Sequence, residues 1–141
     1  MPEMTSEEYR GFMLDRARTA SLATVRADGR PHVAPIWFDL DGDTLVFMTG
    51  EDTVKGRNMR RDPRVSLCVD DEEPPFHFVF FEGVAELAPD DPDKLYWATR
   101  IAGRYMGEGL AESYGRRNAV PGELLVRVRP SRVVAQKNIA D

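Results

Sequence analysis

The sequence predicts a mainly β protein, a small antiparallel barrel with helices on its outside. Short apolar segments recur along the 141-residue chain, and Asp-Gly turns separate the first of them. Tight turns rather than helical crossovers join these segments, which favours an antiparallel sheet over a doubly wound parallel one. The length fits one domain, and we expect a single unit over residues 1–141 with six or so strands.

The chain begins with a helix pattern, and three strand patterns follow. In TSEEYRGFMLDRA, Thr5 or Ser6 can cap a short helix whose first turn is acidic. The apolar segments ASLATV, HVAPIWFDL and TLVFMT come next, separated by RADGRP and DGD. Asp-Gly pairs supply the positive φ of a tight hairpin turn. We therefore expect three antiparallel strands in a meander.

The middle of the chain predicts one short helix and two strands. In DTVKGRNMRRDP, Asp52 or Thr53 can cap a helix that ends near Asp62. RVSLCVD alternates as a half-buried strand does. FHFVFFEGVAEL predicts a long strand with a bulge or a close approach at Gly83. Aromatic residues on both faces of this strand indicate that both faces are buried, as at an interface between subunits.

The last third predicts two helices and a final strand. A helix begins at Asp90 or Asp91, a shorter one covers LAESYGRRN, and GELLVRVRPSRVVAQ returns to strand. The first of these helices has an apolar side, and its aromatic pair is expected to pack against the barrel. These residues are Leu95, Ala98, Ile101 and Ala102 for the apolar side and Tyr96 and Trp97 for the aromatic pair.

Composition argues against several functional classes. The chain has 19 Lys and Arg against 24 Asp and Glu, a net charge of -5, which is unlike a protein whose whole surface binds nucleic acid or anionic lipid. Cys68 is the only cysteine, so no intrachain disulfide can form, and a cytoplasmic location is the simpler expectation. No apolar run approaches the roughly 20 residues of a transmembrane helix. We expect a soluble protein with neither nucleic-acid nor membrane partners.

Hydrolase and metalloenzyme motifs are missing from the sequence. There is no nucleophile elbow, no His-Glu-x-x-His and no cysteine pair. His32 and His77 each stand alone at spacings that suit no metal, so ordinary hydrogen-bonded histidines are expected and no metal ligand is assigned. DLDGD lacks the remaining spacing of a calcium loop and is interpreted as a hairpin turn.

One short segment reverses the sign of the charge. Between Glu51 and Arg64 there are five basic and three acidic residues, a local charge of +2 in an acidic chain. The N-terminus of a helix attracts phosphate through its free N–H groups and its dipole. Lys55 and Arg57 lie in the first turn of the predicted helix, and Gly56 would let a ligand approach closely.

A second interpretation of the same segment stays open. The side chains can form a solvated helical face, because Arg60, Arg61 and Arg64 lie beyond the first turn and can pair with Asp62 or Glu51. Charge alone does not decide between a phosphate site and this surface.

Three stretches together resemble a known family. LATVRADGRPHVAPIWF, KGRNMRRDPRVSLCVD and FFEGVAEL are similar to the pyridoxamine 5'-phosphate oxidase-like split β-barrel family, and most of all to its actinobacterial flavin/deazaflavin oxidoreductases, many of which use the deazaflavin coenzyme F420. The resemblance runs from about residue 10 to the C-terminus, and Lys-x-Arg-Asn followed by Arg-Asp-Pro-Arg-Val-Ser is its most specific part. It implies an FMN-binding split barrel and a homodimer with two cofactor sites at the subunit interface.

The resemblance also implies a role for individual residues. The cofactor phosphate would be bound by Lys55, Arg57 and Asn58. The ribityl chain and phosphate would be lined by Met48, Thr49 and Gly50. The ring would lie against Ala34, Pro35, Ile36 and Trp37, and Phe76 and Phe78 would reach it from the partner subunit.

Two positions depart from the pattern of the relatives. Thr53, also assigned to the cofactor site, stands where several relatives have a basic residue, so the phosphate or the tail would be bound less tightly or by other residues. Pro35 lacks the N–H and the polar side chain that some relatives have there, so neighbouring residues must contact the ring.

The activity that the resemblance implies is hydride transfer between F420 and a small conjugated or planar acceptor, at the homodimer interface. The cofactor carries this chemistry, which agrees with the lack of an acid-base pair, and no catalytic residue is assigned. One alternative is an FMN-dependent oxidase or reductase that uses the same cleft. Another is a non-catalytic flavin- or deazaflavin-binding protein, because a fold does not establish turnover. The anionic tail of F420 would suit further basic residues, and the candidates are Arg60, Arg61, Arg116 and Arg117.

Overall fold

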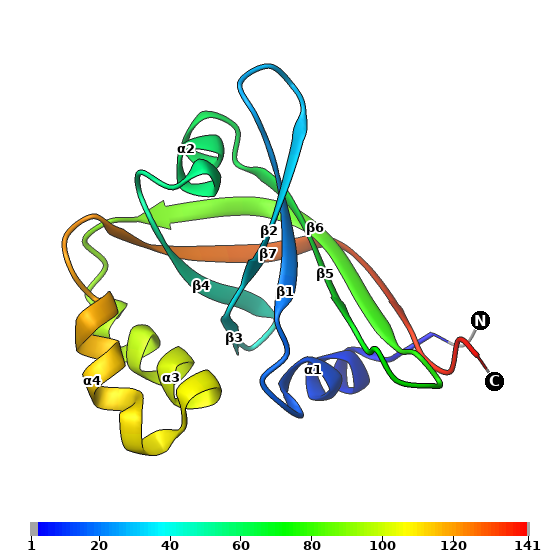
Figure 1. Ribbon diagram of the computed structural model, residues 1–141. Coiled ribbons are helices and arrows are strands. Elements are labelled where there is room, and N and C mark those ends of the chain that lie inside the picture. The colour runs from blue at the N-terminus through cyan, green and yellow to red at the C-terminus, as the bar shows by residue number, and fades with distance from the viewer. Residues whose placement is uncertain (1–2, 141) are drawn as a thin grey trace.

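A seven-stranded antiparallel sheet forms the body of the structure, a computed structural model that describes residues 3–140 (Figure 1). The strands are β1 (Ala20–Val25), β2 (Pro31–Ile36), β3 (Phe38–Asp41), β4 (Thr44–Gly50), β5 (Arg64–Asp70), β6 (Phe78–Ala88) and β7 (Glu123–Gln136). The helices are α1 (Ser6–Leu14), α2 (Val54–Arg61), α3 (Lys94–Met106) and α4 (Glu108–Asn118). The predicted class, antiparallel β with flanking helices, is confirmed.

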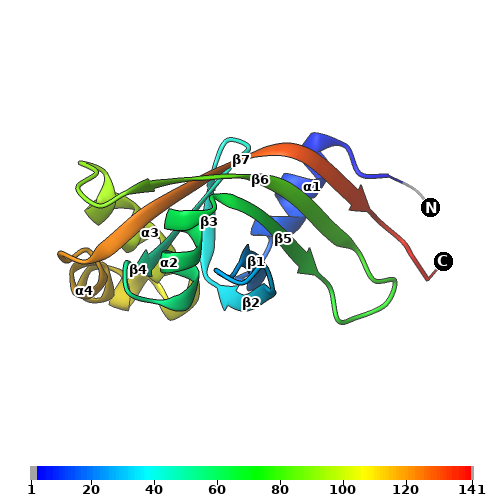
Figure 2. The same cartoon turned by 90° about the horizontal axis from the view of Figure 1, so that it is seen from above.

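The sheet curls because its two outer strands are neighbours in the sequence. The strand order is β2-β1-β5-β6-β7-β4-β3, so β2 and β3 lie at opposite edges of the sheet although only Trp37 separates them. The chain thus crosses from one edge to the other at a single residue, and a curved, barrel-like sheet results. In Figure 2, the long strands β6 and β7 run through the whole sheet with a marked twist.

The predicted meander of three adjacent strands was wrong, although both of its pairings occur. β1 pairs with β2, and β3 pairs with β4. The segment HVAPIWFDL is two strands rather than one, because its first half joins β1 and its second half joins β4 at the other edge. This division at Trp37 explains why the sheet has seven strands where six or so were expected.

Local signals predicted the shorter features correctly. Thr5 caps α1 in a capping box with Glu8, and the hydroxyl of Thr53 accepts the N–H of Gly56 at the start of α2. At Gly83 the register of β6 against β7 shifts, and a methyl group there would lie 2.5 Å from the carbonyl oxygen of Arg129. Gly83 is therefore both a bulge and a point of close approach.

The helix α3 begins later than expected, but it buries most of the side that was predicted to be apolar. It starts at Lys94, after Asp93, instead of at Asp90 or Asp91. Tyr96, which was expected to pack against the barrel, is about half exposed, and so is Leu95 of the predicted apolar side. The residues that α3 does bury are Trp97, Ala98, Ile101, Ala102 and Gly103. α4 also begins earlier than predicted, at Glu108.

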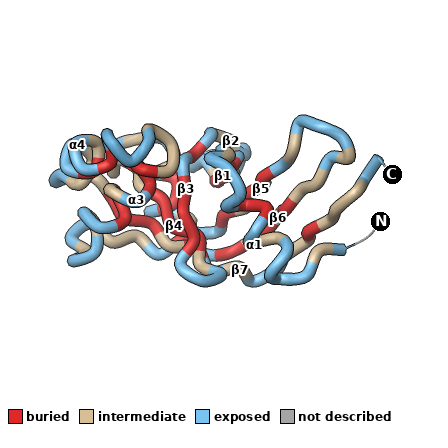
Figure 3. Tube along the Cα trace, turned by 90° about the horizontal axis from the view of Figure 1, so that it is seen from below, coloured by how far each residue is buried: buried red, intermediate tan, exposed pale blue. Residues whose placement is uncertain are grey.

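Two clusters of buried side chains hold the fold together. The larger fills the curved inner face of the sheet, and Phe38, Phe47 and Leu67 are among its fully buried members. Alternate residues of β4 and β7 point to the opposite face of the sheet. On that face, Val46 and Leu125 pack against Trp97 of α3. Figure 3 shows this burial along the central strands. The second cluster fixes α3 beside β4, and side chains of both elements line the cavity that is described below.

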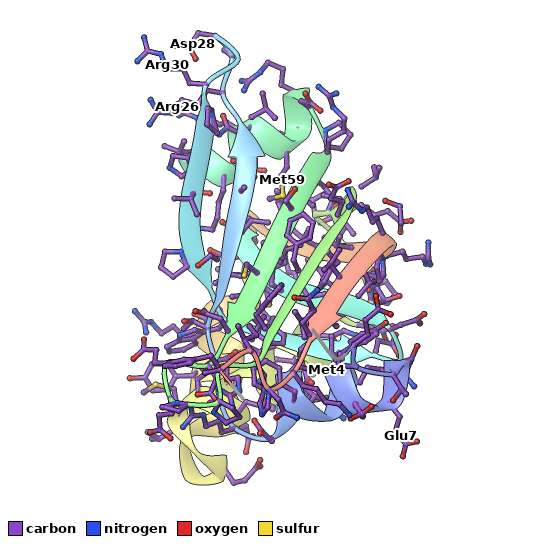
Figure 4. All side chains as sticks on the ribbon, turned by 90° about the vertical axis from the view of Figure 1, so that its right-hand side faces the viewer. Met4, Glu7, Arg26, Asp28, Arg30 and Met59 are labelled. Atoms are coloured by element: carbon purple, nitrogen blue, oxygen red, sulfur yellow. The ribbon has the colours of Figure 1, made fainter. Side chains whose placement is uncertain are left out.

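The hairpin of β1 and β2 extends beyond the sheet, next to α2. In Figure 4, Arg26, Asp28 and Arg30 lie at its exposed tip, whereas Met59 of α2 points into the interior. α2 is joined to β1 by a buried hydrogen bond, in which the amide of Asn58 donates to the hydroxyl of Thr24 at 3.0 Å.

Candidate functional site

A cavity of about 380 Å³ opens where four elements meet, namely the end of β2, the end of β4, the start of α2 and the side of α3. Its volume is within the usual range of small-ligand sites. Eight predicted site residues line it: Pro35, Ile36, Trp37, Met48, Thr49, Gly50, Thr53 and Lys55. The other lining residues are Ala98, Ile101, Asn118 and Glu123, none of which was predicted.

The cavity is apolar at one end of its β4 wall and polar at the other. Because Phe38 pairs with Phe47, Trp37 lies beside Met48, and the side chains of α3 complete this apolar part. Two residues further along β4, Gly50 pairs with Glu123 and leads into α2, which carries Lys55. A planar apolar group and an anionic group joined to it would suit these two ends.

The apolar end is held in place by an aromatic stack. The rings of Trp37 and Tyr105 have centroids 4.8 Å apart and planes at 1°. The hydroxyl of Tyr105 accepts the N–H of Phe38 at 3.1 Å and donates to the carbonyl of Arg18. Tyr105 was not singled out from the sequence, where nothing distinguishes it from any other helical tyrosine.

At the polar end, one hydroxyl joins β4 to α2. Thr53 Oγ1 lies 2.8 Å from Thr49 Oγ1, donates to the carbonyl of Gly50 at 2.8 Å and accepts the N–H of Gly56 at 3.1 Å. Gly56 is buried, and a methyl group there would lie 2.4 Å from the oxygen of Gly50. The expectation that Gly56 admits a ligand is therefore wrong, because the missing side chain lets α2 pack on the end of β4.

The basic residues of the charge-reversed segment divide into two groups. Three have partners: Arg60 pairs with Glu51 at 3.7 Å, Arg61 donates to the carbonyl of Val25, and Arg64 pairs with Asp62 at 2.7 Å. The hydrogen bond from Arg64 is the main cause that lowers the pKa of Asp62 to about 2. The solvated-face interpretation thus describes these three arginines.

The remaining two, Lys55 and Arg57, have no side-chain hydrogen bond or ion pair within residues 3–140. Lys55 lines the cavity, whereas Arg57 is exposed and lies outside its lining. These are the two residues that the sequence placed in the first turn of the helix, where an anion would bind.

Four other predicted residues lie outside the cavity of this chain. Ala34 is half-buried in β2, and Asn58 is buried, with its amide oxygen accepting from Arg61 at 3.0 Å. Phe78 is the first residue of β6 and Phe76 lies two residues before it, and this end of β6 lies opposite to α3 and α4 (Figures 1 and 2). The contacts predicted for Arg57, Asn58 and the two phenylalanines with the cofactor stay predictions.

The unpredicted cavity residue with a charge is Glu123. Burial raises the pKa of its carboxyl group, and the positive charges of Lys94 and Lys55 act in the opposite direction. A single glutamate at the start of a strand gives no signal in the sequence, because its place in the cavity depends on the pairing of β7 with β4.

Three further observations concern the cysteine, metal ligands and membrane-spanning helices. Burial raises the pKa of Cys68, which disfavours the reactive thiolate. In the part of the chain that the structure describes, no three His, Cys, Asp or Glu residues are placed to hold a metal ion. Across residues 3–140, no helix is both long enough and apolar enough to span a membrane.

Comparison with known proteins gives one family match over nearly the whole chain. The model of the family described as Pyridoxamine 5'-phosphate oxidase matches residues 5–137. The pyridoxine/pyridoxamine 5'-phosphate oxidase of Cupriavidus metallidurans is 29% identical over an alignment of 106 residues, and the match covers 70% of this chain and 47% of that protein. The chain therefore spans about half the length of that relative.

Two solved structures have the same fold and similar sequences. A conserved hypothetical protein from Mycobacterium tuberculosis superposes with a TM-score of 0.80 and 28% identity, over 94% of this chain and 84% of that one. A protein named F420 reductase superposes with a TM-score of 0.69 and 29% identity, over 94% of this chain and 98% of that one.

Proposed function

Because the chain belongs to the pyridoxamine 5'-phosphate oxidase family, we propose that it is an oxidoreductase that transfers a hydride between the deazaflavin coenzyme F420 and a small conjugated or planar acceptor. The cavity between β4, α2 and α3 carries this proposal, since it combines an aromatic, apolar end with a lysine that has no anionic partner among the described residues. The similarity to the protein named F420 reductase supports the choice of cofactor.

The residues present fit a flavin-type group. A tricyclic ring needs a flat apolar surface, and Trp37 with Ile36 and Ile101 supplies one. A phosphate needs a cation and free N–H groups, which Lys55 and the first turn of α2 supply. The arrangement of the two ends matches the order of ring, ribityl chain and phosphate in such a cofactor.

Each part of the cavity has a physical role in the proposed reaction. The bound cofactor supplies the hydride chemistry. Trp37, fixed by Tyr105, would orient the ring, and the apolar side of α3 would keep water from it. Lys55 would bind the phosphate and so determine the position of the whole group.

We further propose that the protein is a homodimer whose sites lie between the subunits. Phe76 and Phe78 lie far from the cavity of their own chain, so they reach a ring only if it is bound by a second copy. Phe80 is half-buried and Phe76 is 38% exposed, which leaves apolar surface at this end for a partner.

Two alternatives use the same cavity. An FMN-dependent oxidase or reductase is supported by the family description. Its cofactor, FMN, lacks the anionic tail that F420 carries. Of the four arginines considered for the tail of F420, Arg60, Arg61 and Arg116 already have protein partners, and Arg117 lies over the ring of Tyr114. A non-catalytic cofactor-binding protein is the second alternative.

The first experiment is a titration of the purified protein with F420 and with FMN, followed by the fluorescence of each cofactor. Tight binding of F420 with weak binding of FMN would support the proposal. A preference for FMN would favour the first alternative, and binding of neither would contradict a phosphate site at Lys55. Reduction of an acceptor by the loaded protein faster than by free F420 would exclude the non-catalytic alternative.

A further inference from the structure

Glu123 brings a carboxylate to the end of the cavity where the phosphate would bind. It is the first residue of β7 and pairs in register with Gly50, from which the chain turns into α2. A methyl group on Gly50 would lie 3.4 Å from Thr53 Cγ2 and 3.5 Å from Glu123 Oε1. The carboxylate therefore lies over the last residue of β4 beside the N-cap of α2, and it lines the same cavity as Lys55.

This carboxylate is unpaired in the part of the chain that is described, although Lys94 and Lys55 are near enough to lower its pKa. Its oxygens take part in no hydrogen bond or ion pair among residues 3–140. Lys94 faces it, but the Nζ of Lys94 donates to the backbone carbonyls of Pro89, Val120 and Glu123 at 2.9 to 3.0 Å. The neighbouring acid Glu51 is paired with Arg60.

A half-buried carboxylate disfavours a second anion near it, and the cost increases with the charge of that anion. The end of the cavity thus holds one attractive group, Lys55, and one repulsive group, Glu123. A site with this composition distinguishes the phosphate groups that bind beside Lys55 by their charge, because specificity can come from repulsion as well as from attraction.

We propose that Glu123 is a specificity-determining residue that disfavours a doubly charged phosphomonoester and so favours a singly charged phosphodiester beside Lys55. This inference rests on the proposed function. The two candidate cofactors differ in this property. FMN ends in a phosphomonoester, whose charge near neutral pH is about -1.5 to -2. The phosphate of F420 is a diester between the ribityl chain and the lactyl group, and it carries one negative charge.

The test measures the dissociation constants of FMN, F420 and riboflavin for the wild type, Glu123→Gln and Glu7→Gln at low salt and about pH 7.5. Riboflavin has the ring and ribityl chain of FMN without the phosphate, so it reports on the ring alone. Glu7→Gln is the matched control, because Glu7 is exposed on α1 and has no ion pair within the described residues (Figure 4). Thermal melting confirms that each variant is folded.

In Glu123→Gln we expect FMN to bind about tenfold more tightly, the effect of removing one nearby charge in a partly solvated site. F420 should gain less, about threefold, because its phosphate has one charge. Riboflavin should bind as before, and Glu7→Gln should change none of the three constants. Glu123→Ala should give the same shift in preference, since charge rather than shape is responsible.

Two results would overturn this inference and leave the proposed function standing. One is an unchanged ratio of FMN affinity to F420 affinity in Glu123→Gln, and the other is a gain in riboflavin affinity equal to that of FMN. Binding of neither cofactor by any of these proteins would instead overturn the proposed function, and this inference with it.

Discussion

The indole ring of Trp37 stacks on the phenol ring of Tyr105, with 4.8 Å between the centroids and 1° between the planes. Tyr105 lies on α3, and Trp37 is the residue at which the chain passes from one edge of the sheet to the other. The hydroxyl of Tyr105 bonds to Phe38 and to Arg18 as well. One side chain therefore joins α3, the point of sheet closure and the segment before β1, and it does so behind the apolar end of the cavity.

Removing the hydroxyl and removing the ring of Tyr105 should have different effects. Tyr105→Phe keeps the stack but leaves the N–H of Phe38 without its partner, so we expect the free energy of unfolding to fall by about 1 to 3 kcal/mol. Tyr105→Leu also loses the stack and should move the emission of Trp37 to longer wavelength. Urea denaturation and fluorescence, in a Trp97→Phe background, measure the two effects. Equal emission spectra in both variants would contradict a role of the stack in placing Trp37.

Lys55→Ala and Arg57→Ala should each weaken cofactor binding by about 1.5 to 3 kcal/mol, the scale of a hydrogen bond between charged groups. Arg64→Ala is the control, because Arg64 belongs to the same segment but is paired with Asp62. Titration of each variant with F420 and FMN gives the affinities. Unchanged affinity in the first two variants would refute their assignment to the phosphate.

Phe76→Ala and Phe78→Ala should weaken cofactor binding although neither residue lines the cavity of its own chain, because the partner's ring-contacting aromatic would be lost. Sedimentation velocity should show more monomer in these variants. Leu110→Ala, which removes an exposed side chain of α4, is the matched control. Wild-type protein that sediments as a monomer and still binds the cofactor would be incompatible with the proposed interface.

Stability should depend on pH through Glu123 even without a ligand. Burial raises the pKa of this carboxyl group above its ordinary value of 4.5, so the folded protein holds the proton more tightly than the unfolded chain. Stability is then lost as the pH rises from about 4.5 through the folded pKa. We expect Glu123→Gln to have a higher Tm than the wild type at about pH 8 and no advantage below about pH 4. A constant difference in Tm across this range would indicate a cause other than ionisation.

Features that depend on a few neighbouring residues could be predicted from the sequence. The caps at Thr5 and Thr53, the Asp-Gly hairpins and the bulge at Gly83 all follow from local chemistry, and the structure contains them. The family resemblance, which rests on three separate stretches of the sequence, is confirmed as well. Eight of the thirteen predicted site residues line one cavity. Four of them, Pro35, Ile36, Trp37 and Lys55, lie within those stretches, and the other four lie at the end of β4 and at the N-cap of α2.

Features that depend on distant pairing could not be predicted. The segment HVAPIWFDL divides at Trp37 because its first half pairs with β1 and its second half pairs with β4. The residues around Trp37 do not indicate these distant partners. Glu123, Ala98 and Ile101 enter the cavity through the packing of β7 and α3 on β4. Gly56 was misinterpreted for the same reason, because the carbonyl that it approaches belongs to another element.

The prolines of β2 limit how the sheet can grow. β2 is an edge strand, and Pro31 and Pro35 lie four residues apart in it, so both face the same way along the hydrogen-bonding direction. Proline has no N–H, and within a sheet its nitrogen is found on the side without a partner strand. A further strand therefore cannot continue the sheet past β2 with an unbroken ladder. Edge-to-edge aggregation, to which exposed strands are prone, is obstructed here, and any partner at this edge would have to dock through side chains instead.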